Sequence, residues 1–123
     1  MPANGLDRLN PAEGVAIVEF VHLLEERFGN LISSVALFGS KARGESTPDS
    51  DLDVLVVVDS EDWRIHKQIR YLAADIGLKY NVDLSPRVWS GAHHVEMERL
   101  PSLLYQNIRR DSINLLEIHH VLG

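Results

Sequence analysis

The run from Leu52 to Val58 constrains the fold most, because six of its seven residues are apolar and only Asp53 interrupts it. A strand that is apolar on both faces must be covered on both faces, and such strands usually lie in the interior of a sheet. A second β-rich run, from Ile32 to Phe38, ends at Gly39-Ser40 and predicts another strand. We therefore expect a sheet in which residues 52–58 form a central strand.

Two amphipathic helices are predicted around these strands. Asn10 can cap the first helix, with Pro11 in its first position and Glu13 closing a capping box. Gly29 is the predicted end of that helix. The second helix is predicted to begin at a Ser60 cap and to end at Gly77. Its expected buried stripe has helical spacing and consists of Ile65, Ile69, Leu72 and Ile76.

The remaining segments complete a small α/β (α+β) domain. Residues 80–84 alternate as a third strand, with Tyr80, Val82 and Leu84 on one face. Residues 41–50 read as a turn or short helix followed by a loop, and short helices are expected at 92–99 and 101–110. The tail, 113–122, fits a strand or a helix. The order predicts a small mixed sheet flanked by helices, in a single domain spanning 1–123 with its core at about 10–116.

Composition excludes several classes of protein. Apolar residues make up 45% and charged residues 24% of the chain, which is typical of a globular domain. A net charge of −6 argues against binding nucleic acid through bulk charge, so we expect no nucleic-acid partner. The absence of cysteine excludes disulfides, thiolate zinc sites and cysteine nucleophiles. No membrane-length apolar run or export signal stands out, so we expect a cytoplasmic domain without a membrane partner.

Asp51 and Asp53 are the first candidates for chemistry. Residues two apart at the start of a strand project from the same face, so the two carboxylates converge. Converging carboxylates repel each other unless a cation lies between them. Oxygen-only ligands favour Mg²⁺, although a solvated strand end is the common alternative for an isolated Asp-x-Asp pair.

Gly39 and Ser40 add a candidate phosphate site. A glycine at a strand end allows close approach of a ligand, and a helical turn opening at Ser40 would present free N–H groups and a hydroxyl to an anion. Gly39 to Ser46 also approaches the phosphate-loop pattern G-x-x-x-x-G-K-[ST]. Glu45 occupies the lysine position of that pattern and would repel phosphates, so the phosphate-loop interpretation fails on charge.

Gly39-Ser40, ten residues, and then Asp51-Leu52-Asp53 resemble the signature of the DNA polymerase beta-type nucleotidyltransferase superfamily. The fuller string, Gly39-Ser40-Lys41-Ala42-Arg43-Gly44 followed by Ser50-Asp51-Leu52-Asp53, is similar to its minimal members, the MNT proteins often encoded beside HEPN partners. Asp83 fits the position of the third acidic residue that family members place on a later strand. The resemblance covers about residues 15–116.

The resemblance implies a catalytic site made of Asp51, Asp53 and Asp83, which would hold Mg²⁺, or Mn²⁺ in its place, against the triphosphate of ATP. Asp83 is expected either to accept the attacking proton or to lie beside the metal ion that lowers the pKa of the attacking hydroxyl. Gly39, Ser40 and neighbouring N–H groups would bind the nucleotide. Arg43 would add positive charge there, or would instead pair with Glu45 or Asp49 at the surface.

The implied function is transfer of AMP from ATP onto a hydroxyl of a partner protein, as the antitoxin of a HEPN-like toxin. Larger relatives carry an extra domain that binds the acceptor, and the sequence ends soon after the third acid, so we expect a partner protein, a second subunit or a shallow surface to hold the acceptor. Two alternatives stay open. One is a small-molecule nucleotidyltransferase, similar to aminoglycoside-modifying enzymes, that works as a homo-oligomer, a dimer whose interface forms the acceptor pocket. The other is a non-catalytic antitoxin that neutralises its partner by occlusion.

Histidines and tryptophans are assigned more ordinary roles. His93-His94 and His119-His120 are adjacent pairs that point apart in regular structure, so surface or partner contacts are expected rather than metal ligation. Trp63 and Trp89 are expected to be packing residues, because no basic aromatic strip is evident around them.

Overall fold

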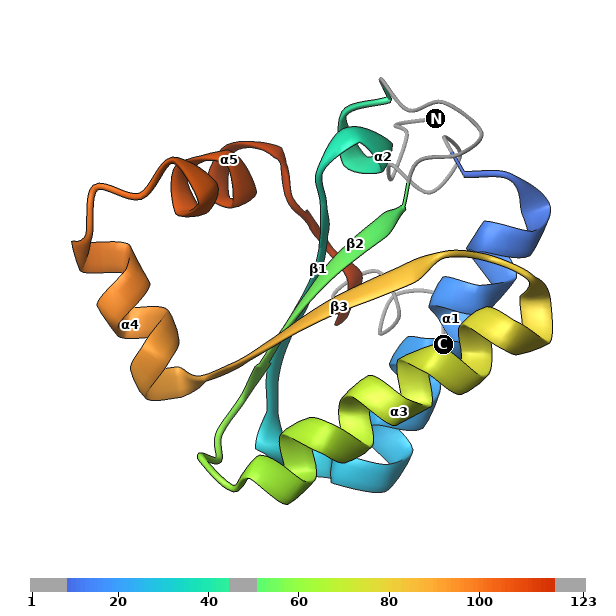
Figure 1. The fold of residues 1–123 in the computed structure, drawn as a ribbon, viewed down its shortest axis with the longest axis horizontal. Coiled ribbons are helices and arrows are strands. Elements are labelled where there is room, and N and C mark those ends of the chain that lie inside the picture. The colour runs from blue at the N-terminus through green and yellow to red at the C-terminus, as the bar shows by residue number, and fades with distance from the viewer. Residues whose placement is uncertain (1–8, 45–50, 117–123) are drawn as a thin grey trace.

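The computed structural model describes residues 9–44 and 51–116, which form a four-stranded mixed sheet covered by helices (Figure 1). β2 (Leu52–Val58) pairs antiparallel with β1 (Ile32–Phe38) and parallel with β3 (Leu84–Ser90). A two-residue strand, β4 (Ile113–Asn114), pairs antiparallel with the other side of β1, which gives the order β3-β2-β1-β4. β2 therefore lies inside the sheet, as its apolar sequence predicts.

Helices α1 (Pro11–Phe28) and α3 (Trp63–Tyr80) cover one face of the sheet (Figure 1). Alternate residues of β2 point toward them, so that Leu52, Val54, Val56 and Val58 belong to the main hydrophobic core. The intervening residues Leu55 and Val57 face the opposite side, where they form a smaller core with Phe38, Trp89 and Ile108. Asp53 shares the face of Leu55 and Val57, because it follows the same two-residue period.

The second face is partly covered by α4 (Gly91–Arg99) and α5 (Leu103–Asp111), which lie on the left of Figure 1. These helices confirm the two short helical stretches expected from the sequence. The first two residues of the tail form β4, and Leu115 and Leu116 begin a helical turn. The rest of the predicted tail element, 117–122, lies outside the described residues.

The predicted start and end of α1 are confirmed. The side-chain oxygen Oδ1 of Asn10 accepts the Glu13 N–H at 2.8 Å, and Oε1 of Glu13 accepts the Asn10 N–H at 3.0 Å. These two bonds satisfy main-chain donors that the first turn leaves unpaired. Gly29, with φ of +52°, ends the helix and begins a short 3₁₀ helix, Gly29–Leu31.

Both predicted boundaries of α3 are wrong. Asp62 is the N-cap, because its Oδ1 accepts the Arg64 N–H at 2.9 Å, while the Ser60 hydroxyl accepts the Asp62 N–H one step earlier. The helix continues past Gly77 to Tyr80. A Cβ on Gly77 would meet the Val82 carbonyl oxygen at 2.9 Å. Glycine is therefore needed here because the chain after α3 packs closely against this residue, and not because the helix ends.

The third strand also differs from its prediction: it is Leu84–Ser90, and Tyr80 is the last residue of α3. The alternation of apolar residues at 80–84 reflects burial rather than a strand, because Tyr80, Val82 and Leu84 all pack against the main core. Pro86 lies within this strand. β3 is an edge strand, where a residue without an N–H is tolerated.

Within the described residues, no helix combines the length and apolar character needed to span a membrane.

Candidate functional site

Gly39 lies between the end of β1 and the four-residue helix α2 (Ser40–Arg43), where the chain turns sharply. Its φ is +77°, a backbone conformation that residues other than glycine rarely adopt. A Cβ at this position would collide with the carboxylate oxygen Oδ2 of Asp53 and would lie 3.3 Å from its Cγ. Glycine is therefore required here for two reasons: the positive φ, and the direct packing of the backbone on the Asp53 carboxylate.

Asp51 and Asp53 stand at the start of β2, as predicted. Asp53 is half-buried and is paired in register with Phe38, the last residue of β1. Asp51 is exposed, just before the first strand residue. The antiparallel pairing of β1 and β2 brings the glycine loop at the end of β1 to the aspartates at the start of β2.

Asp83 reaches the same place by a route that the sequence does not reveal. It precedes β3 rather than lying within a strand, but its carbonyl oxygen accepts the Leu52 N–H at 2.7 Å. Leu52 is paired with Leu84 in the parallel ladder, so the residues just before them, Asp51 and Asp83, lie side by side. The structure thus brings the backbones of all three predicted aspartates to one end of the sheet.

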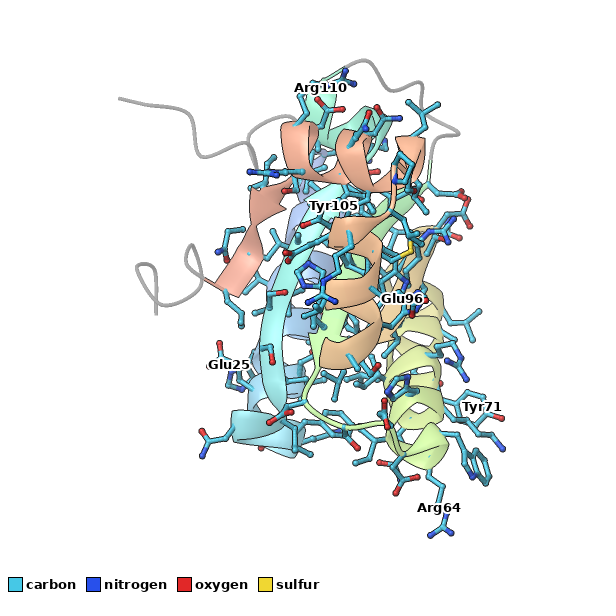
Figure 2. The ribbon with its side chains drawn as sticks, turned by 90° about the vertical axis from the view of Figure 1, so that its left-hand side faces the viewer. Glu25, Arg64, Tyr71, Glu96, Tyr105 and Arg110 are labelled. Atoms are coloured by element: carbon cyan, nitrogen blue, oxygen red, sulfur yellow. The ribbon has the colours of Figure 1, made fainter. Side chains whose placement is uncertain are left out.

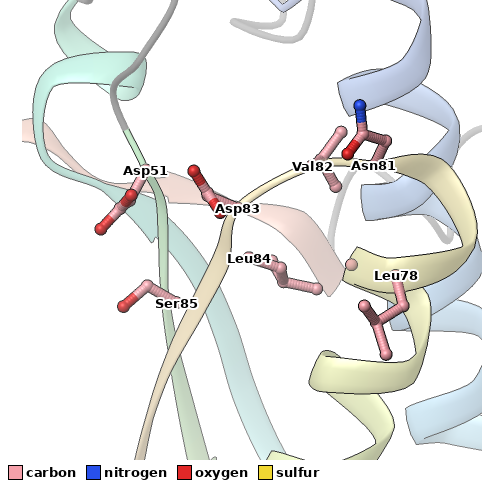
Figure 3. Close-up of a pocket in the computed structure, with 8 residues that line it drawn as sticks. Asp51, Leu78, Asn81, Val82, Asp83, Leu84 and Ser85 are labelled. Atoms are coloured by element: carbon pink, nitrogen blue, oxygen red, sulfur yellow. The ribbon is translucent and has the colours of Figure 1, made fainter.

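A hollow of about 530 Å³ opens beside these aspartates (Figure 3). Asp51 and Asp83 lie on neighbouring segments at one side of it, and Leu84 points toward Leu78 of α3. Its lining comes from the end of α3, the connection after it and the start of β3, and consists of Asp51, Gly77, Leu78, Asn81, Val82, Asp83, Leu84 and Ser85. The hollow is therefore open to a ligand that could reach two exposed carboxylates.

The donor set at this end of the sheet fits a hard cation, because it consists of carboxylate oxygens. Within residues 9–44 and 51–116, however, no three His, Asp or Glu side chains lie close enough together to bind one metal ion. Asp51 and Asp83 are exposed and have room to turn. The site thus has the residue types and backbone positions for a divalent cation, and it would need side-chain rotation to enclose one.

Other predicted site residues fall on the border of the described structure. The backbone of Ser40 begins α2, as expected, but the side chains of Ser40 and Arg43 lie outside the described part. Glu45 and Asp49, the alternative partners of Arg43, lie outside it as well, as do His119 and His120.

Sequence reasoning missed three features of the site. Lys41, next to Ser40, is buried and points to Glu13 of α1, with Nζ and Oε2 2.8 Å apart. Asn81 lines the hollow in a left-handed conformation, with φ of +54°. Ser85 lies beside Asp53 in the ladder. An asparagine directly after a helix is a known signal for that conformation, but the misplaced third strand concealed both Asn81 and Ser85.

The histidine and tryptophan predictions have mixed outcomes. Trp89 is buried, as expected, and its ring meets the His93 ring edge-on at a centroid distance of 5.1 Å. Trp63 is not a packing residue, because 64% of it is exposed on α3. His94 Nδ1 lies 3.4 Å from Glu98 on the same helix.

Comparisons with known proteins agree with this geometry. A model of the nucleotidyltransferase domain matches residues 17–111. A Methanocaldococcus jannaschii protein with the provisional name protein adenylyltransferase is 39% identical over 79 residues, covering 63% of this chain and 74% of the relative. A second such protein of that organism is 34% identical over 71 residues, covering 55% of this chain and 48% of the relative.

The fold is also that of a known structure. A crystal structure described as a toxin–antitoxin with AMP-PNP superimposes with a TM-score of 0.53 and 17% identity, over 80% of this chain and 71% of that chain. At this identity the likeness shows the fold alone. The family model covers most of the described chain and includes both the glycine loop and all three aspartates. The chain therefore belongs to the nucleotidyltransferase domain family and has the fold expected from the resemblance in its sequence.

Proposed function

We propose that this nucleotidyltransferase moves AMP from ATP onto a hydroxyl group of a partner protein, with Asp51, Asp53 and Asp83 as its catalytic residues. The observation that carries the proposal is the packing of Gly39 directly on the Asp53 carboxylate. This contact supports the proposal, because a triphosphate bridged to a cation requires its phosphate-binding loop to lie next to the residue that holds the cation.

The three aspartates would hold Mg²⁺, with Mn²⁺ as a substitute. When bound, such an ion draws negative charge from the phosphates and lowers the pKa of a nearby hydroxyl. Asp53 is the best-fixed of the three ligands, since it is half-buried and packed against Gly39. Asp51 and Asp83 are exposed at the hollow and would turn toward the nucleotide.

The chain's own groups would carry out the rest of the reaction. Ser40, the N–H groups of α2 and the Arg43 guanidinium would hold the β- and γ-phosphates. The acceptor oxygen would then attack the α-phosphorus in line with the oxygen that bridges to the β-phosphorus. As the new phosphorus–oxygen bond forms, the bridging bond breaks and pyrophosphate leaves. Asp83 would accept the proton of the hydroxyl.

A protein acceptor is supported by two observations. The M. jannaschii relatives are named protein adenylyltransferases, and the toxin–antitoxin structure of the same fold contains AMP-PNP. We therefore propose a HEPN-like toxin as the acceptor, and a cytoplasmic antitoxin role for this chain. The hollow at Asp51 and Asp83 is open, so that a side chain of another protein could enter it.

The test uses the protein encoded by the adjacent gene as acceptor, incubated with this chain, Mg²⁺ and ATP. We expect the mass of one or more AMP groups on the neighbour, and none when Asp51 and Asp53 are both changed to Asn. A stable complex without modification, in which the double variant still neutralises the neighbour, would favour occlusion. Release of pyrophosphate only with an added small molecule would favour the small-molecule enzyme.

A further inference from the structure

The outer face of α3 carries large apolar side chains that no element among residues 9–44 and 51–116 covers. Trp63 is 64% exposed, Tyr71 is 59% exposed and Leu78 is 84% exposed. At 100° per residue these three positions fall within one arc of the helix, opposite the buried residues Ile69 and Ile76. A row of exposed side chains of this size on one helix face is unusual for a surface without a partner.

Basic side chains lie between and beside the two aromatic residues of this row. Lys67 Nζ lies 5.7 Å from the centre of the Trp63 ring and 5.3 Å from that of Tyr71, and Arg64 Cζ lies 5.9 Å from the Trp63 ring. Arg70 is exposed on the same side. We call Trp63, Arg64, Lys67, Arg70, Tyr71 and Leu78 the α3 stripe. Figure 2 shows Arg64 and Tyr71 pointing outward from the helix.

The charge of the α3 stripe is opposite to that of the whole chain. Three cations gather on this stretch of helix, whereas the protein has a net charge of −6. Tryptophan, tyrosine and arginine are the residues most often found as energetic anchors of protein interfaces. The combination fits a protein partner that presents acidic side chains around an apolar contact.

The stripe leads to the candidate active site. Leu78, at its C-terminal end, lines the hollow that contains Asp51 and Asp83 (Figure 3). From Trp63 to Leu78 the helix rises roughly 22 Å, at 1.5 Å per residue, which is a usual span for one interface. A protein lying along α3 would therefore reach the hollow with its far end.

We propose that the α3 stripe is the docking surface for the acceptor protein and that the acceptor meets it with an acidic surface. This inference rests on the proposed function, because it identifies how the acceptor is held. Single-stranded RNA is the rival occupant of a basic aromatic surface. The net charge of −6 and the 84% exposed Leu78 favour protein, since a leucine neither stacks on bases nor contacts phosphate.

The test measures binding of the adjacent-gene protein by calorimetry without Mg²⁺ or ATP, so that catalysis does not contribute. Trp63→Ala with Tyr71→Ala, and separately Arg64→Glu with Lys67→Glu, should each raise Kd by a factor of about ten or more. These positions are exposed, and acidic residues in the first turns of a helix are tolerated, so both variants should fold. The charge-reversal variant should also lose most of the salt dependence of binding.

Matched controls change the same chemistry elsewhere. Arg27→Glu with Arg99→Glu reverses two exposed charges, and Leu100→Ala with Leu103→Ala removes two exposed apolar side chains. Both controls should bind like wild type. Wild-type affinity in the stripe variants would overturn the docking surface, as would stripe-dependent binding of a single-stranded RNA 20-mer that is tighter than binding of the neighbour.

The two proposals fail in different ways. If the stripe variants bind normally while wild type still adenylylates the neighbour, the docking surface is wrong and the function stands. If the stripe variants lose binding but Asp53→Asn leaves modification unchanged, the docking surface stands and the catalytic assignment is wrong. If wild type neither binds nor modifies the neighbour, both proposals fall.

Discussion

Lys41 and Glu13 form a buried ion pair that fastens α2 to α1, with Nζ of Lys41 2.8 Å from Oε2 of Glu13 and side chains only 5% and 8% exposed. The other oxygen of Glu13 accepts the Asn10 N–H in the capping box. One carboxylate therefore fixes both the start of α1 and the short helix that follows Gly39. Lys41, next to the predicted phosphate loop, therefore holds that loop against α1 through Glu13, and its ammonium group does not point toward a phosphate site.

Breaking this pair should be costly, because a charge would stay buried without its partner. Lys41→Met and Glu13→Gln should each lower the free energy of unfolding by about 3–5 kcal/mol. Combining them should recover part of that loss, since neither charge then remains. Urea denaturation of both single variants and the double variant measures the coupling. Single losses below about 1 kcal/mol would show that the pair contributes little.

Gly39→Ala should disturb the site more than it disturbs the fold. The added methyl group collides with the Asp53 carboxylate, and alanine at positive φ costs about 1–2 kcal/mol. We expect moderate destabilisation together with loss of Mg²⁺-dependent ATP binding. Gly14→Ala is the control, because a methyl group there meets no atom within 4 Å and alanine favours the helix. Unchanged ATP affinity in Gly39→Ala would contradict the packing argument.

Tyr105 should make stability depend on pH at the alkaline end. Burial, followed by the nearby Glu98 carboxylate, raises the pKa of the Tyr105 hydroxyl above its ordinary value of 10.0. The folded state keeps this proton to higher pH than the unfolded chain. Its contribution is therefore complete below about pH 10 and is lost as pH rises through the raised pKa.

Urea unfolding from about pH 8 to pH 11.5 checks this sign. The stability of wild type should fall relative to that of Tyr105→Phe above about pH 10. Tyr71→Phe removes an exposed phenol and is the control variant. Parallel curves for wild type and Tyr105→Phe would contradict the expected shift.

Divalent cations should stabilise the folded protein through the aspartates. Mg²⁺ with ATP at a concentration of about one hundred times Kd should raise the free energy of unfolding by about 2.7 kcal/mol through mass action. This increase corresponds to a rise in Tm of several degrees. Asp53→Asn should abolish this rise. Asp59→Asn, an exposed aspartate just after β2, should keep it. An equal rise in wild type and Asp53→Asn would place the cation elsewhere.

The elements that the sequence predicts correctly are those set by local pattern. The central strand follows from its apolar run, the start of α1 from its capping box, and the position of Asp51 and Asp53 at the start of β2 from their place at the beginning of that run. Each of these depends on residues close in sequence or on one strand pairing.

The wrong start of α3 is a local matter, because Asp62 caps the helix through the Arg64 N–H only two residues away, but the other missed features depend on tertiary contacts. Pro86 is tolerated because β3 is an edge strand, and Gly77 is required by the Val82 carbonyl rather than by the end of a helix. The burial of Lys41 depends on where α1 lies, and the exposure of Trp63 depends on which side of α3 meets the sheet. None of these relationships has a local signal in the sequence.

Transfer of the α-phosphate is the most direct measure of the central claim. The adjacent-gene protein is incubated with this chain, Mg²⁺ and ATP labelled at the α-phosphate in one sample and at the γ-phosphate in another. AMP transfer predicts label on the neighbour from the α-position alone, with none from the Asp51→Asn, Asp53→Asn double variant and full labelling from Asp59→Asn. Label from the γ-position, or undiminished α-label with the double variant, would contradict the account.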